Sequence, residues 1–161
     1  MPWKKPYHPA KNQRLNLALY TEANRITFFT IRAYLNQKPF AKNDICQMII
    51  DTLQAEQTRL GCLVYTYCLM TDHLHYLSSP KQDGNSILKF TDQFKGKTTN
   101  ESWKLGWKGK LWQPRSYDHI VRAEEDLRET ARYILNNPVR AGLVAHAEDW
   151  PWSGHLNPLP L

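Results

Sequence analysis

Two apolar runs with almost no connection between them constrain the fold of this chain more than any other feature. Leu63–Met70 and His73–Ser79 are rich in β-branched and aromatic residues, and only Thr71 and Asp72 separate them. So short a connection is typical of a β-hairpin. The sequence therefore predicts two neighbouring antiparallel strands in the middle of the chain.

The segments around this hairpin alternate between strand and helix patterns. Further strands are predicted at residues 25–34 and 117–121, and helices at about 43–59, from Asn85 or Ser86 onward, and from about 124 to 136. The helices are indicated by apolar residues at helical spacing, which are Ile45, Met48, Ile49 and Leu53, then Ile87, Leu88, Phe90 and Phe94, then Leu127, Ala131 and Ile134. Gly61 ends the first helix and Pro138 limits the third, while Glu124, Glu125 and Asp126 place negative charge in the first turn of the third.

The first six elements follow the order strand, helix, strand, strand, helix, strand. This order matches the split β-α-β family of ferredoxin-like folds. We therefore expect an α+β protein with a four-stranded antiparallel sheet and two helices on one face. The third helix is additional and could cover the other face of the sheet.

Length and composition are those of one globular domain. The chain has 161 residues, a hydrophobic share of 42% and a formal net charge of +6, so we expect an anionic partner, with nucleic acid the first candidate and plain solubility the alternative. We divide it into a basic arm (1–24), a catalytic domain (25–152) and a tail (153–161).

Cysteine usage and the absence of targeting patterns indicate a cytoplasmic location. Cys46, Cys62 and Cys68 are odd in number and show no Cys-x-x-Cys spacing, and Cys62 and Cys68 lie in apolar sequence as expected of reduced core residues. We see neither a signal peptide nor a membrane-spanning run.

His73 and His75 lie two residues apart in the predicted third strand. Alternate residues of a strand share a face, so the two imidazoles point the same way, roughly 6–7 Å apart along the strand. Such a pair can bind a divalent metal, although two core or surface histidines would give the same pattern.

Tyr133 and Asn137 are four residues apart and lie on one face of the last turn of the third helix. If that helix packs over the histidine face, Asn137 could provide a third metal ligand and Tyr133 would stand beside the metal. A phenol can attack a phosphate whose oxygens are held by a Lewis acid. The alternative is a packing tyrosine followed by a helix stop.

Together these segments resemble a known family. His73-Leu-His75 is similar to the HUH motif, in which two histidines flank a hydrophobic residue. Residues 111–119, 124–127 and 132–144, which include Trp112-Gln113 and Tyr133-Ile-Leu-Asn-Asn-Pro138, resemble the REP-associated tyrosine transposases. The resemblance covers about residues 14–152. It departs at Thr71-Asp72, where we expect a proline-containing turn.

The resemblance implies a bacterial, nucleoid-associated enzyme that binds a single-stranded DNA hairpin and cleaves and rejoins DNA beside it. His73 and His75 would hold Mg²⁺ or Mn²⁺, with Asn137 as a further ligand. Tyr133 would attack the scissile phosphate and form a 5′-phosphotyrosine. The protein would act as a monomer or a homodimer.

The resemblance also implies that basic residues of this chain bind DNA. The candidates are Lys4, Lys5, Lys11 and Arg14 in the arm, and Lys95, Lys97, Lys104, Lys108, Lys110 and Arg115 in a segment that also contains Trp103, Trp107 and Trp112. Trp103 or Trp107 could stack on unpaired bases. The alternative is a solvated lysine-rich loop with tryptophans in the core. His119 could support the catalytic site or be structural.

Three other functions are compatible with parts of the pattern. A domesticated protein could bind hairpin nucleic acid without cutting it. A non-haem iron oxygenase would need an acidic ligand, and Asp72 would point to the other face of an extended strand. A relaxase-like nickase shares the chemistry, but the small size and the single C-terminal tyrosine favour a transposase.

Overall fold

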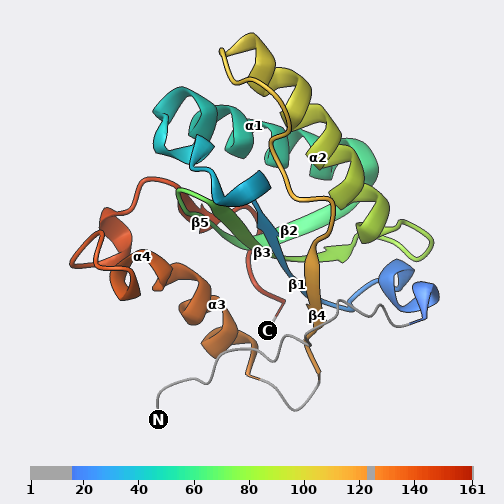
Figure 1. Cartoon of the computed structure of the whole chain (residues 1–161). Helices are drawn as coiled ribbons and strands as arrows, with labels where there is room; N and C mark the ends of the chain where they lie inside the picture. Colours follow the sequence, from blue (N-terminus) through green and yellow to red (C-terminus); the bar gives the residue numbers. More distant parts are fainter. Residues whose placement is uncertain (1–15, 123–125, 161) are drawn as a thin grey trace.

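A computed structural model of the chain describes residues 16–122 and 126–160. It contains an antiparallel sheet of five strands in the order β4-β1-β3-β2-β5 (Figure 1). The strands are β1 (Thr27–Arg32), β2 (Cys62–Leu69), β3 (His73–Pro80), β4 (Tyr117–Ile120) and β5 (Ser153–His155). The α-helices are α1 (Asn43–Leu60), α2 (Ile87–Lys104), α3 (Leu127–Leu135) and α4 (Asn137–Arg140), and the 3₁₀ helices are Leu17–Thr21, Tyr34–Asn36, Pro39–Ala41 and Ala147–Asp149.

The central hairpin forms as predicted. Strands β2 and β3 pair from Leu69↔Leu74 to Cys62↔Pro80, with an irregularity between Val64 and Tyr67. The backbone N–H of Met70 donates to the carbonyl of His73 at 2.8 Å, so Thr71 and Asp72 alone make the turn. The predicted pair of antiparallel strands is thereby confirmed.

Local capping fixes where the helices begin and end. Gly61 follows α1 with a left-handed φ of 67°, and a Cβ there would lie 2.5 Å from the amide nitrogen of Asn85. Ser86 caps α2 by accepting from the N–H of Lys89, and Asp126 caps α3 by accepting from that of Arg128. Asp126 thus precedes the first turn of α3, while Glu124 and Glu125 lie outside the described residues.

The sheet is covered on both faces (Figure 1). Helices α1 and α2 pack on the face that carries Phe29, Leu74 and Tyr76. Helix α3 packs on the opposite face, where Ala131 and Ile134 join a cluster that includes Phe28, Cys68 and Leu77. The expectation that the third helix covers the other face is confirmed, and the ferredoxin-like α+β class holds.

The fifth strand was not predicted. We expected four strands and a C-terminal tail at residues 153–161. Residues 153–155 pair with β2 through Thr66↔His155, Tyr67↔Gly154 and Cys68↔Ser153. A Ser-Gly-His segment has no apolar alternation, and only the exposed hydrogen-bonding edge of β2 makes it a strand.

Cys62 and Cys68 are buried, as predicted for core residues, and Cys46 is buried as well; the three cysteines form no disulfide with one another. Burial raises the pKa of Cys46 and Cys62 to about 11 and that of Cys68 to about 12. Within residues 16–122 and 126–160, no helix is both long enough and apolar enough to cross a membrane.

Candidate metal and nucleophile site

The two histidines lie side by side on the sheet face that α3 covers. Leu74 between them packs into the opposite core, so His73 and His75 share the other face. Their ring centroids are 4.7 Å apart, closer than the spacing of their positions along the strand. His75 is buried, and its Nδ1 is 2.9 Å from the hydroxyl of Thr30 on β1. The predicted convergence of the two imidazoles is therefore present in the structure.

His73 is held from both sides of its ring. Its Nδ1 lies 2.7 Å from the Asp72 carboxylate, which can only accept, so Nδ1 carries the proton and Nε2 the lone pair. Burial lowers the pKa of His73, and the hydrogen bond that its Nδ1–H donates to Asp72 opposes this shift only in part. The ring is thus a neutral imidazole at neutral pH, the form that ligates metals.

Asn137 contacts the Nε2 side of the His73 ring, where the lone pair lies. Its amide nitrogen is 3.1 Å from His73 Nε2, a contact between residues 64 positions apart in the chain. Rotating the Asn137 side-chain amide by 180° would put its carbonyl oxygen where the nitrogen now lies, since the oxygen and the NH₂ group have nearly the same shape. Asn137 begins α4 rather than ending the preceding helix, and the break at Asn136 precedes Pro138. The sequence-based pairing of Asn137 with the histidine face matches this geometry.

Tyr133 lies half-buried on the same side of the sheet. Phe28 connects it to the histidines, because the Phe28 ring is 6.5 Å from Tyr133 and 5.3 Å, edge-on, from His75. The guanidinium of Arg140 stands over the Tyr133 ring, 3.9 Å from its centroid. Helix α3 therefore presents a phenol within the same cluster as the imidazole pair.

His119 lies on this face as well, at some remove. It is paired with Phe28 across β1 and β4, so both side chains point toward the α3 side. His119 therefore lies next to Phe28, and Phe28 separates it from His75.

Four residues around the site were missed as contributors from the sequence. Asp72 was expected to point away from His73, but it lies in the turn, not in the extended strand, so its carboxylate reaches the ring. Thr30 and Arg32 come from β1, where they pair in register with His75 and His73. Arg140 is seven residues after Tyr133, a helical spacing that could have indicated it.

The donor set suits a metal that is also bound by other groups. Within the described parts of the chain, no cluster of three His, Cys, Asp or Glu side chains could hold a metal ion. Two neutral imidazoles and one amide are available, which leaves positions for water and phosphate oxygens. Such a set could form an open site for a divalent metal that is also bound by water and phosphate, rather than a closed structural site.

The predicted basic residues on α2 lie on another surface than the histidines. Lys4, Lys5, Lys11 and Arg14 lie outside the described residues. Helix α2, with Lys95, Lys97 and Lys104, packs on the sheet face opposite the histidines (Figure 1). These lysines therefore lie on a different side of the molecule from the imidazole pair.

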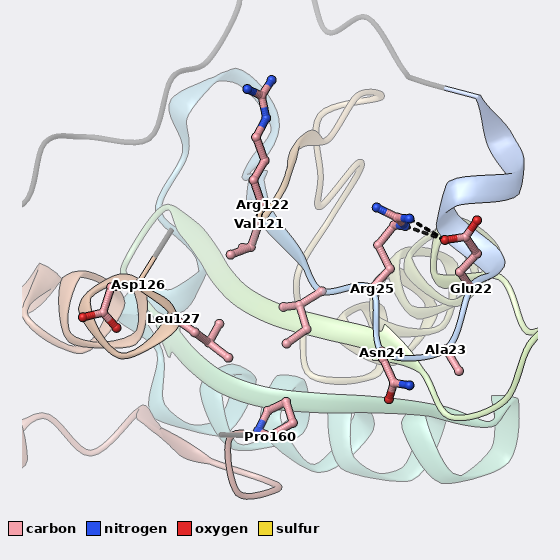
Figure 2. A pocket seen from close by; sticks show the side chains of 10 residues that line it. Glu22, Ala23, Asn24, Arg25, Val121, Arg122, Asp126, Leu127 and Pro160 are labelled. Atoms are coloured by element: carbon pink, nitrogen blue, oxygen red, sulfur yellow. Dashed lines mark hydrogen bonds and ion pairs between the residues drawn. The ribbon is translucent and has the colours of Figure 1, made fainter. Parts of the chain in front are cut away.

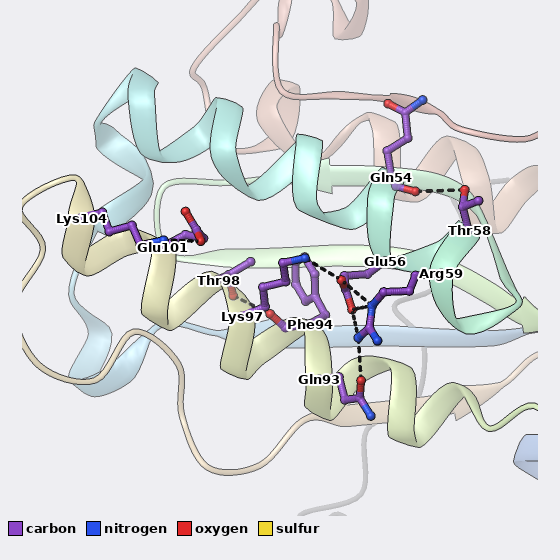
Figure 3. Close-up of polar contacts among 10 residues, drawn as sticks. All are labelled: Gln54, Glu56, Thr58, Arg59, Gln93, Phe94, Lys97, Thr98, Glu101 and Lys104. Carbon is purple, nitrogen blue, oxygen red and sulfur yellow. Dashed lines mark hydrogen bonds and ion pairs between the residues drawn. The ribbon is translucent and has the colours of Figure 1, made fainter.

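Several of these lysines bind groups of their own chain. Lys97 is 3.0 Å from Glu56, a fully buried carboxylate that also binds Arg59 (Figure 3). Those bonds, led by the one from Arg59, lower the pKa of Glu56. Lys104 pairs with Glu101 at 3.0 Å, as Figure 3 also shows, and Lys95 donates to the carbonyl of Gln113.

The remaining candidates of this segment are exposed. Lys108 and Arg115 lie on the surface, and Lys110 stands over the Tyr34 ring at 5.1 Å. Of the tryptophans, Trp112 is buried, Trp107 is half-buried and Trp103 is 52% exposed. Trp103 is thus the most accessible of the three for stacking, and Trp112 belongs to the core.

A separate hollow of about 610 Å³ lies at the other end of β1 from His73 (Figure 2). Arg25, Arg122 and Asp126 are among its lining residues, and Arg25 is tied to Glu22 at 2.6 Å. Because it lies at the start of β1 whereas His73 faces Arg32 at the end, this hollow is distinct from the histidine site.

A ferredoxin-like sheet with a histidine pair facing a tyrosine-bearing helix is the arrangement of the HUH single-tyrosine class. The chain belongs to the family described as "Transposase IS200 like", whose model matches residues 26–137. That span begins just before β1 and ends at Asn137, so it contains both histidines and the tyrosine.

Individual relatives agree with this assignment. The chain is 31% identical over 96 residues to a Haemophilus influenzae protein assigned as a REP-associated tyrosine transposase, covering 53% of this chain and 54% of that protein. It is 29% identical over 91 residues to the REP-associated tyrosine transposase of Escherichia coli, covering 56% and 52%. The resemblance seen in the sequence is thus confirmed, although the chain spans about half the length of these curated relatives.

Two solved structures share the fold. A REP-associated tyrosine transposase bound to a REP hairpin superposes with a TM-score of 0.71 at 20% identity, covering 95% of this chain and 82% of that one. A Deinococcus radiodurans protein assigned as a transposase gives a TM-score of 0.52 at 19% identity, covering 71% and 92%.

Proposed function

We propose that this protein binds single-stranded hairpin DNA, cleaves it beside the hairpin and rejoins it through a 5′-phosphotyrosine on Tyr133. The contact between Asn137 and His73 is the observation that carries this proposal, because it joins α4, which directly follows the tyrosine-bearing helix α3, to the histidine pair. The hairpin is proposed as partner because the solved relative is bound to one.

His73, His75 and Asn137 would hold the divalent metal, Mg²⁺ or Mn²⁺. When bound, the metal supplies Lewis acidity at a phosphate oxygen. Asp72 and Thr30 engage Nδ1 of the two histidines, which directs each Nε2 to the ligand position. Both rings are then oriented before DNA arrives.

Tyr133 would perform the covalent step. Its hydroxyl oxygen forms a bond to the scissile phosphorus, the phenolic proton passes to solvent, and the bond from phosphorus to the 3′ oxygen breaks. That oxygen takes up a proton and leaves as a 3′ hydroxyl. No oxidant or reductant is required, because one phosphodiester replaces another.

Rejoining is the same reaction in reverse. A 3′ hydroxyl attacks the phosphotyrosine, the tyrosine oxygen leaves, and a DNA phosphodiester forms. The covalent intermediate conserves the phosphodiester bond energy, so strand transfer needs no nucleotide cofactor. The attack by a DNA 3′ hydroxyl distinguishes a strand transferase from a nuclease, in which water is the final acceptor of the phosphoryl group.

DNA would be held mainly through its phosphates. We assign this role to exposed basic residues, Lys108 and Arg115 among the described ones, and to the arm residues Lys4, Lys5, Lys11 and Arg14. Lys95, Lys97, Lys104 and Lys110 contribute positive charge while also bound within the chain. Stacking of an unpaired base on Trp103 would add about 1–3 kcal/mol.

A denaturing gel tests the proposal. Wild type, Tyr133→Phe and the matched control Tyr34→Phe are incubated with Mn²⁺ and labelled hairpin oligonucleotides made from repeats flanking the gene. We expect a covalent protein–DNA adduct with wild type and Tyr34→Phe alone. An adduct that survives in Tyr133→Phe would exclude Tyr133 as the nucleophile. Tight hairpin binding without any adduct would favour a non-cutting binding protein.

A further inference from the structure

Arg140 occupies a position that neither the proposed metal ligands nor the proposed nucleophile explains. It is the last residue of α4, seven residues after Tyr133 and three after Asn137. Its guanidinium stands 3.9 Å from the centroid of the Tyr133 ring. An exposed arginine has many accessible rotamers, and this one lies against the proposed nucleophile.

The position of Arg140 also relates it to the histidine pair through aromatic rings. Its guanidinium stands over Tyr133, whose ring is 6.5 Å from that of Phe28, and the Phe28 ring is 5.3 Å from that of His75. Arg140 therefore lies on the side of the sheet that carries Tyr133 and His75.

Arg140 keeps its hydrogen-bonding capacity for another molecule. Throughout the described part of the chain, no carboxylate forms an ion pair with it, unlike Arg25 and Arg59, which are each bound by a glutamate. A planar guanidinium has donors in a fixed fork that matches two phosphate oxygens, while its face can remain on an aromatic ring. A phosphate could therefore bind its edge without displacing it from Tyr133.

We propose that Arg140 is a catalytic residue that binds the scissile phosphate at its edge while its face positions the Tyr133 ring. The inference rests on the proposed function and deepens it, because it assigns the phosphate contact beside the nucleophile to this chain's own cation. Arg140 would stabilise the negative charge that gathers on the phosphate oxygens as the tyrosine oxygen attacks. Its location on α4 would couple ring orientation to phosphate binding.

The test compares a charged and an uncharged scissile linkage. The linkage that wild type cleaves is mapped first, and a second hairpin oligonucleotide is made with a methylphosphonate at that position, which removes the charged oxygen. Rates of adduct formation are measured at saturating DNA with Mn²⁺ for wild type, Arg140→Ala, Arg140→Lys and Arg140→Gln. Arg132→Ala serves as the matched control, since Arg132 is an exposed arginine of α3 and its loss changes the net charge equally.

On the phosphodiester we expect Arg140→Ala to slow adduct formation by about 10²–10³-fold, the usual effect of removing one preorganised charge partner. Arg140→Lys should retain more of the rate than Arg140→Gln, and Arg132→Ala should match wild type. On the methylphosphonate the loss caused by Arg140→Ala should shrink to about tenfold or less, because the charge that Arg140 neutralises is already gone.

Two results would overturn the inference while leaving the proposed function intact. One is a wild-type rate in Arg140→Ala; the other is an equal loss on both linkages, which would indicate ring positioning alone. If wild type forms no adduct at all, the proposed function fails and the inference fails with it. If thermal melting shows that Arg140→Ala does not fold, the rates of Arg140→Gln and Arg140→Lys are compared instead. The ratio of these two rates on the phosphodiester and on the methylphosphonate then decides the same question.

Discussion

The carboxylate of Asp72 lies 2.7 Å from Nδ1 of His73, within one residue of chain. The tight turn between β2 and β3 makes this contact possible, because Asp72 is not in extended conformation. A carboxylate behind a ligating imidazole fixes its tautomer and raises its basicity. Asp72 therefore contacts His73 on the Nδ1 side of the ring, whereas Asn137 contacts Nε2.

Replacing Asp72 by alanine should weaken Mn²⁺ binding by about 10–100-fold, the usual effect of losing an outer-shell partner of a metal ligand. Isothermal titration of the DNA-free protein with Mn²⁺ measures this without reference to activity. Asp51→Ala, on the exposed side of α1, is the charge-matched control. Equal affinity in Asp72→Ala and wild type would show that the Asp72 contact does not support a metal ligand.

Acid should destabilise the protein through His73. Burial lowers its pKa below the ordinary 6.5, so the unfolded chain takes up the proton first as the pH falls. The stability that neutral His73 contributes is fully present above about pH 6.5 and is lost as the pH falls through the folded pKa. From urea unfolding at pH 7.5, 6.5 and 5.5, the free energy of unfolding should decline less with falling pH for His73→Gln than for wild type. An equal decline in the two proteins would contradict the prediction that protonation of His73 destabilises the fold.

One chain should supply the whole site. Asn137, at the start of α4, contacts His73 of its own chain, and the preceding helix α3 with Tyr133 packs on the same face of the sheet. Mixing the double variant His73→Ala, His75→Ala with Tyr133→Phe should therefore restore no adduct on a denaturing gel. Restored adduct would indicate a dimer in which tyrosine and histidines come from different chains.

The lysines should separate into two groups by salt dependence. Lys108 is exposed, so Lys108→Ala should lower the slope of log affinity against log salt by about one unit in hairpin binding assays. Lys97 is bound to the buried carboxylate of Glu56, so Lys97→Ala should lower the Tm and change the slope less. The reverse pattern would place the DNA on the α2 face.

Much of the architecture could be predicted because it rests on short-range chemistry. The turn at Thr71-Asp72, the stop at Gly61 and the cap at Ser86 each depend on neighbouring residues. The alternation of Leu74 with His73 and His75 likewise follows from strand geometry. The short β5 carries no such local pattern and could not be found, since its pairing partner is nearly ninety residues away in β2.

The sequence by itself determined the order of the elements, the shared face of the two histidines and the spacing of Tyr133 and Asn137. Only the tertiary structure decided that α3 packs on that face, that Thr30 holds His75, and that Arg140 lies on Tyr133. It also placed the α2 lysines on the opposite side of the sheet from the histidines. Periodicity and capping are encoded over a few residues, whereas these contacts join segments far apart in the chain and form only when burial of both sheet faces brings them together.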